Sequence, residues 1–142
     1  MPYKILLPVD GPRSSANAAR HVAGLAVLIK DLEVHLVNVQ PLGDDWMTRR
    51  TLKAEELDRL EREWAETALA PARETLAAAG IACREHFTQG EVAQSIARLA
   101  GELGCDQIVM GTRGLGSLGD LLMGSVATKV LHLAGLPVTL VK

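Results

Sequence analysis

The sequence predicts an α/β fold: one open parallel sheet of five strands, in the order 3-2-1-4-5, with helices on both faces. Three observations predict it. Short apolar runs alternate with helical patterns along the chain, which is typical of a parallel sheet. The runs are almost continuously apolar, as in strands that are buried on both faces. The length of 142 residues and the 48% hydrophobic content suit a single domain spanning residues 1–142.

The strands follow from apolar runs that end at turn residues. The first run stops at Asp10-Gly11-Pro12, and the second contains four β-branched or aliphatic residues before Pro41. The expected strands are residues 4–9, 33–40, 82–87, 107–110 and 137–141. Right-handed crossovers that build outward from the first strand, and then return to its other side, produce the order 3-2-1-4-5. A crevice should therefore open between the first and fourth strands, at their carboxyl ends.

Between the expected strands, apolar residues recur at the spacing of a helix, which predicts a helix in each of these segments. A helix is expected to open at Ser14 or Ser15, whose hydroxyl can accept from a free amide of the first turn, and to end near Lys30. The other expected helices span residues 44–79, 90–104 and 126–134. In the long one, Leu57, Leu60 and Trp64 form the apolar stripe, and Pro71 should kink or divide it.

The region from Gly111 to Ser125 holds five glycines, directly between a strand and a helix. Glycine lets a ligand approach the backbone amides without a Cβ in the way, as a phosphate cradle requires. Ser125 lies where a helix would begin, so that its hydroxyl, the free first-turn amides and the helix dipole can all face an anion. The alternative is a loop whose glycines serve turns alone.

Two known phosphate motifs fit this region poorly. Residues 114–119 match GxGxxG, but the dinucleotide fingerprint belongs after the first strand and needs an acid about twenty residues later. The sequence has no acidic residue after Asp120, which argues against a dehydrogenase. Residues 119–125 resemble a P-loop without its lysine, so the β and γ phosphates would lack their cation.

The spacing Gly111-x2-Gly114-x9-Gly124-Ser125 resembles the G-x2-G-x9-G-[S/T] motif of the ATP-binding universal stress proteins. The opening segment 5–11, the helix 90–104 and the closing strand from Leu136 are also similar to that family in order and spacing. The resemblance thus covers nearly the whole chain. It implies the adenine nucleotide alpha hydrolase-like form of a Rossmann-like fold.

The resemblance also implies site residues. Asp10 and Gly111 would approach the ribose and Val39 would flank the adenine. The phosphates would be held by four residues of the motif region, Gly114, Gly124, Ser125 and, through its amide, Val126. Arg113 is a further candidate for a phosphate. Asp120 departs from what a phosphate loop needs, because its carboxylate would repel phosphate unless it points away or helps hold Mg²⁺.

The expected function is an ATP-binding regulatory module, with ATP carried alone or with Mg²⁺ and hydrolysed slowly or not at all. One alternative is a nucleotide-independent member of the same family that acts through protein contacts. Another is an enzyme of the ATP-pyrophosphatase type, whose SGGxDS-like loop differs from the sequence that follows Asp10 here.

The composition indicates which partners to expect. Fifteen basic and 17 acidic residues give a net charge of −2, so neither nucleic acid nor an anionic membrane is an expected partner. Cys83 and Cys105 stand alone and the histidines are scattered, so no metal site is expected. We expect a cytoplasmic protein that forms a homodimer through its last strand, which lies at an edge of the sheet.

Overall fold

Five parallel strands form the sheet of the computed structural model, in the order β3-β2-β1-β4-β5. The structure describes residues 1–9, 12–41, 52–112 and 124–142. The strands are β1 (Tyr3–Pro8), β2 (Leu32–Gln40), β3 (Cys83–Gln89), β4 (Gln107–Gly111) and β5 (Val138–Val141). The predicted class and strand order are confirmed, because buried apolar runs and right-handed crossovers leave few alternatives.

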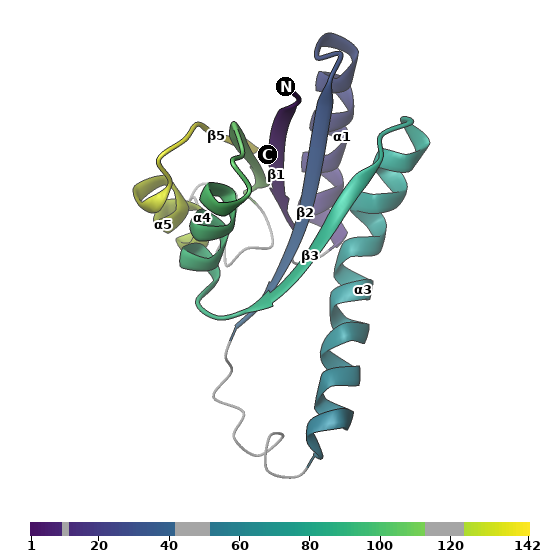
Figure 1. The fold of residues 1–142 in the computed structure, drawn as a ribbon, viewed down its shortest axis with the longest axis vertical. Coiled ribbons are helices and arrows are strands. Elements are labelled where there is room, and N and C mark those ends of the chain that lie inside the picture. The colour runs from purple at the N-terminus through teal and green to yellow at the C-terminus, as the bar shows by residue number, and fades with distance from the viewer. Residues whose placement is uncertain (10–11, 42–51, 113–123) are drawn as a thin grey trace.

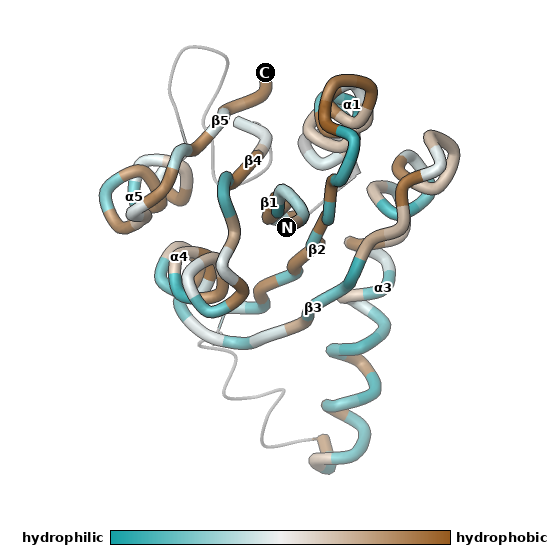
Figure 2. The backbone as a smooth tube through the Cα atoms, turned by 45° about the horizontal axis from the view of Figure 1, so that its top comes forward, coloured by the Kyte–Doolittle hydropathy of each residue, from teal (hydrophilic) through white to brown (hydrophobic). Residues whose placement is uncertain are grey.

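Helices cover both faces of this sheet (Figure 1). The described helices are α1 (Pro12–Leu28), α3 (Ala54–Ala78), α4 (Val92–Glu102) and α5 (Ser125–Leu133). Figure 2 shows α1 and α3 on one side of the strands, and α4 and α5 on the other. Two separate apolar cores result, one beneath each helix pair.

The alternation of side chains along β1 supplies both cores. Ile5 and Leu7 pack with α1 and α3, whereas Leu6, between them, packs with α4 and α5. All three side chains are fully buried. Successive residues of a strand point to opposite faces, so this central strand holds the two layers together.

The start of α1 corrects the sequence-based expectation. The helix begins at Pro12 and ends at Leu28, rather than running from Ser14 or Ser15 to Lys30. Proline is favoured at the first helical position, because its fixed φ suits the helix and its missing N–H has no acceptor there. Ser15 therefore lies buried inside the helix rather than at its cap.

The structure corrects two points of the expectation for α3, its division at Pro71 and the place of Trp64 in the apolar stripe. The helix is not divided at Pro71, since one helix runs through it from Ala54 to Ala78. A proline inside a helix lacks one backbone donor and crowds the preceding turn, but buried residues on both sides of Pro71 pack the helix against the sheet. Trp64 does not belong to the inner stripe, because it is 49% exposed. The buried residues are instead mostly alanines, which let the helix approach the sheet closely: Ala65, Ala68, Leu69, Ala72 and Leu76.

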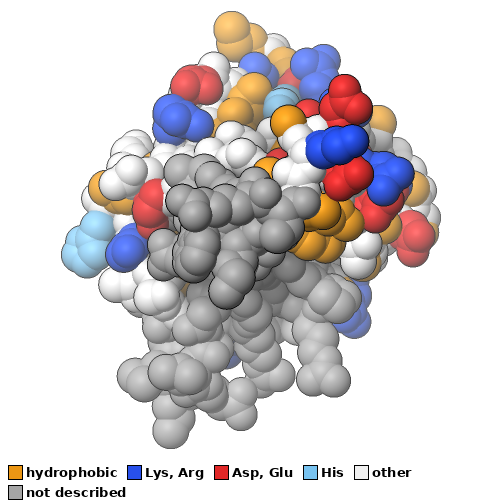
Figure 3. All heavy atoms as spheres, turned by 90° about the horizontal axis from the view of Figure 1, so that it is seen from below, with side chains coloured by type: hydrophobic (Ala, Val, Ile, Leu, Met, Phe, Trp, Pro, Cys, Tyr) orange, Lys and Arg blue, Asp and Glu red, His pale blue; other side chains and the backbone are white. Residues whose placement is uncertain are grey.

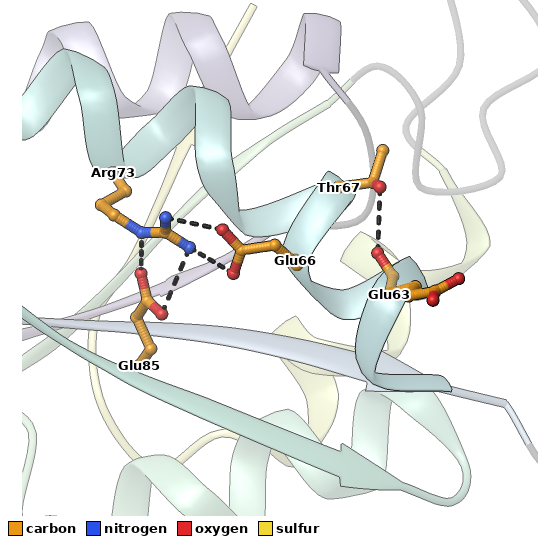
Figure 4. Close-up of polar contacts among 5 residues, drawn as sticks. All are labelled: Glu63, Glu66, Thr67, Arg73 and Glu85. Atoms are coloured by element: carbon orange, nitrogen blue, oxygen red, sulfur yellow. Dashed lines mark hydrogen bonds and ion pairs between the residues drawn. The ribbon is translucent and has the colours of Figure 1, made fainter. Parts of the chain in front are cut away.

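An ion-pair cluster joins α3 to the edge strand β3. The Arg73 guanidinium donates to both carboxylate oxygens of Glu66, at 2.7 Å each, and its Nε donates to Glu85 on β3 (Figure 4). These hydrogen bonds raise the pKa of Arg73 further above its ordinary range, and they lower the pKa of Glu66. The planar guanidinium thus bridges a helix and a strand with charge-assisted bonds.

In the described part of the chain, none of the helices is long and apolar enough to cross a membrane.

The helix α4 ends as predicted, since Gly104 follows it with φ +66°. Such a positive φ is easily adopted by glycine and closes a helix end. The amide of Cys105 then bonds the Ala100 carbonyl at 2.9 Å and leads the chain into β4.

Candidate functional site

The strand order reverses between β1 and β4, so the carboxyl edge of the sheet at this switch point is where the sequence predicts a ligand crevice. The register between these strands consists of Ile5↔Gln107 and Leu6↔Ile108. Both strands continue past these pairs, β1 to Pro8 and β4 to Gly111. Ligands of open α/β sheets bind at such a switch point.

On the β1 side of the switch point, Val9 follows the strand and is 2% exposed. Its amide donates to the Val37 carbonyl at 2.8 Å, and its carbonyl accepts from Asn38 Nδ2 at 2.9 Å. Asp10, the predicted ribose contact, follows directly in the chain but lies outside the described residues.

Val39 lines the side of β2 that faces α4 and α5. It is buried in the same apolar core as Met110, and Val126 packs against that core from the start of α5. Three segments that are far apart in the sequence therefore meet here. Their side chains are aliphatic, so an adenine ring at this place would meet apolar walls rather than an aromatic stack.

On the β4 side of the switch point, the strand ends at Gly111, which is buried and pairs with Val141 of β5. The next residue, Thr112, donates to the Val141 carbonyl from its amide at 3.0 Å and from its hydroxyl at 3.4 Å. These bonds hold the chain against β5 where it enters the glycine-rich region. Arg113 and Gly114 lie outside the described residues, as does Asp120.

The helix α5 begins at Ser125, close to the predicted start at Val126. The buried Gly124 precedes it, and its carbonyl accepts from the Thr128 amide at 3.0 Å and from the Thr128 hydroxyl at 3.1 Å. The first-turn amides have no acceptor within the helix. Ser125 is exposed, so its hydroxyl and these amides form a neutral donor group suited to an anion.

Figure 3 looks at the molecule from this end. Lys, Arg, Asp and Glu side chains lie mixed along one rim, beside hydrophobic side chains. In the part of the chain that the structure describes, no three His, Cys, Asp or Glu side chains gather as metal ligands. Among the described residues at this edge, the start of α5 offers an anion its backbone donors and the helix dipole.

Of the eight predicted site residues, five are described: Val39, Gly111, Gly124, Ser125 and Val126. The structure brings them to one edge of the sheet. Sequence reasoning missed Asn38 and Gln40, whose side chains bond one another beside Val9. The available signal was an amide between two valines of β2, since an amide that is buried needs a hydrogen-bond partner.

Among the residues that the structure describes, the groups with shifted pKa lie away from this edge. Burial raises the pKa of both thiols, Cys105 to about 11. Desolvation lowers the pKa of His86, and the hydrogen bond from His35 lowers the pKa of Glu33.

A groove of about 710 Å³ lies at the opposite edge of the sheet, at the amino ends of the strands. Its lining includes Tyr3, Lys4, Glu33, Arg84 and Asp106.

Comparison with known proteins agrees with this geometry. A family model described as the universal stress protein family matches residues 1–142. Universal stress protein MJ0531 of Methanocaldococcus jannaschii is 31% identical over 139 residues, covering 98% of this chain and 81% of that protein. The structure of hypothetical protein MJ0577 superposes with a TM-score of 0.84 at 28% identity, covering 100% of this chain and 96% of the other. The universal stress protein from Archaeoglobus fulgidus, solved in complex with dAMP, has a TM-score of 0.73 at 25% identity, and the coverage is 99% and 98%.

Proposed function

This chain belongs to the universal stress protein family, and we propose that it binds ATP at the carboxyl edge of its sheet. One observation carries the proposal: the start of α5, the end of β4 and the apolar wall at Val39 meet at the switch point of the strand order. The Archaeoglobus fulgidus universal stress protein, which is 25% identical to this chain and was solved in complex with dAMP, supports an adenine nucleotide as the ligand.

The phosphates would bind at the start of α5. Gly124 presents no Cβ there, and the amides of Ser125 and Val126 belong to the first turn, whose donors have no helical acceptor. The Ser125 hydroxyl would add a further donor. Gly114 and the Arg113 side chain would complete the cradle from the glycine-rich region, and Mg²⁺ would accompany the phosphates as their counter-charge.

The nucleoside would lie across the crevice toward β2. Val39, which is 8% exposed, would form the wall beside the adenine. Asp10 and the backbone of Gly111 would approach the ribose, one from each side of the switch point. The parallel pairing of β1 with β4 at the switch point supports this orientation.

Nucleotide release and binding measurements test the proposal. Denatured, freshly purified protein should release ATP or ADP, identified by chromatography. In titration calorimetry, Ser125→Ala should weaken ATP binding by about 1.5–3 kcal/mol, roughly tenfold or more. Gly124→Val should weaken it further, because a branched side chain would fill the phosphate space. Thr67→Ala, which removes an exposed hydroxyl from α3, should leave the affinity unchanged.

Two results would contradict ATP binding. If nothing is released and no binding is detected on titration, the protein is a nucleotide-independent member that acts through protein contacts. If NAD is released, the glycine-rich region serves a dinucleotide. An unchanged dissociation constant in both the Ser125 and Gly124 variants would place the phosphates elsewhere.

We also propose a homodimer that forms through β5. This strand lies at the edge of the sheet, and its four residues, Val138–Val141, are only partly buried. A second copy could pair with the open edge and cover these side chains. Sedimentation should show a dimer at micromolar concentration, and a monomer would contradict it.

The free thiols of Cys83 and Cys105 favour a reducing compartment such as the cytoplasm.

A further inference from the structure

Three side chains of β2 and β3 form a hydrogen-bonded row. Glu33 Oε1 lies 2.7 Å from His35 Nε2, and His35 Nδ1 lies 2.9 Å from His86 Nε2. His35 is 2% exposed, whereas Glu33 and His86 are partly buried. The row ends on the edge strand β3. Because Glu33 and His35 belong to the amino half of β2, the row is distinct from the proposed ATP site.

The hydrogen bonds determine which nitrogen of each ring carries a proton. An ionised carboxylate can only accept, so His35 donates to Glu33 from Nε2. His35 Nδ1 is then a lone pair, and it accepts from His86 Nε2. The remaining nitrogen of His86, Nδ1, carries a lone pair and no proton when the ring is neutral.

This Nδ1 of His86 is in contact with solvent. The hydrogen bond that the structure gives the ring is made by the other nitrogen, Nε2. In the part of the chain that the structure describes, every buried side-chain nitrogen has a hydrogen-bond partner. A nitrogen without a partner is therefore not buried, and a reagent can reach it.

The order of the three groups is that of an activated nucleophile. In such sites the nucleophile lies within hydrogen-bond reach of a base, and a third group orients the base. Here His86 is the nucleophile, His35 is the base and Glu33 orients the base. Desolvation lowers the pKa of His86, so the neutral ring predominates at pH 7.5. The hydrogen bond from His35 lowers the pKa of Glu33, so the carboxylate is ionised there.

A cation lies beside the nucleophile. Arg84 and His86 are two residues apart on β3, so their side chains share one face of the strand. The Arg84 side chain is 73% exposed, and its Nη1 lies 3.7 Å from Glu33 Oε1, which is longer than a hydrogen bond. Its charge contributes to the lowered pKa of His86. A guanidinium in this place suits an incoming group with several negative oxygens, such as a phosphoryl group.

We propose that His86 is a phosphoryl-acceptor site, at which Nδ1 attacks the phosphorus of a small donor of the phosphoramidate class. The bond from Nδ1 to phosphorus forms as the phosphorus–nitrogen bond of the donor breaks, and ammonia leaves with the electron pair of that bond. The Nε2 proton of His86 moves to His35 Nδ1, so the phosphorylated ring is neutral. His35 becomes an imidazolium beside the ionised Glu33, and Arg84 pairs with the phosphoryl oxygens.

Phosphoramidate itself is the probe, applied to the full chain at pH 7.5. Tandem mass spectrometry of digests kept alkaline identifies the modified histidines, and ³¹P NMR distinguishes the Nδ1 product from the Nε2 product. His86 should be phosphorylated about tenfold faster or more than the exposed His21 and His132, because a positioned base assists it. Its product should be the Nδ1 isomer.

Two variants test the roles of the row. His35→Gln can still bond both neighbours but cannot take up the proton, so it should slow phosphorylation of His86 about tenfold or more. Glu33→Gln, at a partly buried position, is the second variant in case His35→Gln does not fold, and it should slow the reaction by a smaller factor. The rates at His21 and His132 should not change in either variant.

The positioning role of Glu33 has its own spectroscopic signature. An amide can donate as well as accept, so Glu33→Gln no longer fixes the proton of His35 on Nε2. In ¹⁵N NMR, His86 should be the Nε2–H tautomer in the wild type and a mixture of tautomers in Glu33→Gln. A merely structural role of Glu33 would leave the tautomer unchanged.

Three results would overturn the proposal. The first is a wild-type rate at His86 no greater than the rates at His21 and His132. The second is an Nε2 product at His86, and the third is an unchanged rate at His86 in both variants. None of these results bears on ATP binding, because the row and the carboxyl edge of the sheet share no residue.

Discussion

His35 Nδ1 lies 2.9 Å from His86 Nε2, and the two rings stack with their centroids 5.1 Å apart. The other nitrogen of His35 lies 2.7 Å from Glu33 Oε1. With Glu33 ionised, His35 carries its proton on Nε2 and its Nδ1 accepts from His86. His86 pairs with Val37 in the register, so it is the diagonal neighbour of His35 across β2 and β3.

The contacts among Glu33, His35 and His86 predict that the protein is less stable in mild acid. Desolvation, His35 and Arg84 lower the pKa of His86, so the unfolded chain takes up the proton more readily than the folded protein. His86 thus adds stability that is complete above about pH 6.5 and is lost as the pH falls through its lowered pKa. The pKa of Glu33 is also lowered, and its contribution is lost in the same direction at lower pH.

Urea unfolding between pH 7.5 and 5 measures this effect. The slope of the unfolding free energy should be less than about 1.4 kcal/mol per pH unit, because His86 is in partial contact with water. His86→Gln should flatten the slope, whereas His132→Gln, at an exposed position of α5, should not. Equal slopes in the wild type and His86→Gln would show that the pair does not carry the acid sensitivity.

The Arg73 cluster should contribute modestly to stability, in a salt-dependent way. Arg73→Met should lower the unfolding free energy by about 1 kcal/mol, because a bidentate pair with Glu66 and a bond to Glu85 are both lost. The difference should shrink in 1 M salt, since the cluster is partly exposed. Arg98→Met, which breaks a 3.6 Å pair with Glu102 within α4, is the control and should have a smaller effect. A loss that does not depend on salt would point to packing of the arginine stem instead.

Pro71 is an unfavourable residue inside a continuous helix. Its ring crowds the preceding turn and it cannot donate a backbone bond. Pro71→Ala should therefore raise the unfolding free energy by about 1–3 kcal/mol, measured as a shift of the urea midpoint with unchanged slope. A decrease would mean that packing of the half-buried ring outweighs the restored helical bond.

Bound ATP should be hydrolysed far more slowly than the median enzyme rate of about 10 per second. Efficient phosphoryl transfer needs a placed metal, a group that orients water and positive charge on the transition state. The start of α5 supplies neutral donors, which hold the ground state and the transition state about equally and so do not raise the rate. Hydrolysis at several per second with Mg²⁺, abolished by Ser125→Ala or Asp10→Asn, would make the protein an ATPase.

The strands were predictable because each depends on residues that are close together in the sequence, and their order was predictable from the connections between them. An apolar run that ends at a turn identifies a strand from a few positions, and the handedness of crossovers orders the strands. The convergence of Gly111 and Ser125 follows from that order together with the glycine spacing. Pro71 shows the limit of local rules, because packing of α3 along its length overrides one unfavourable residue.

The sequence by itself determined the class of fold and the strand order, since these follow from periodicity and chain connectivity. Tertiary structure alone decided which stripe of α3 is buried, because several stripes carry apolar residues and only the distance to the sheet selects the alanines. It also decided the contacts of Asn38 with Val9 and of His35 with His86, which are 29 and 51 residues apart. Such contacts depend on the register between strands, and a register is set by packing of the whole sheet rather than by any local pattern.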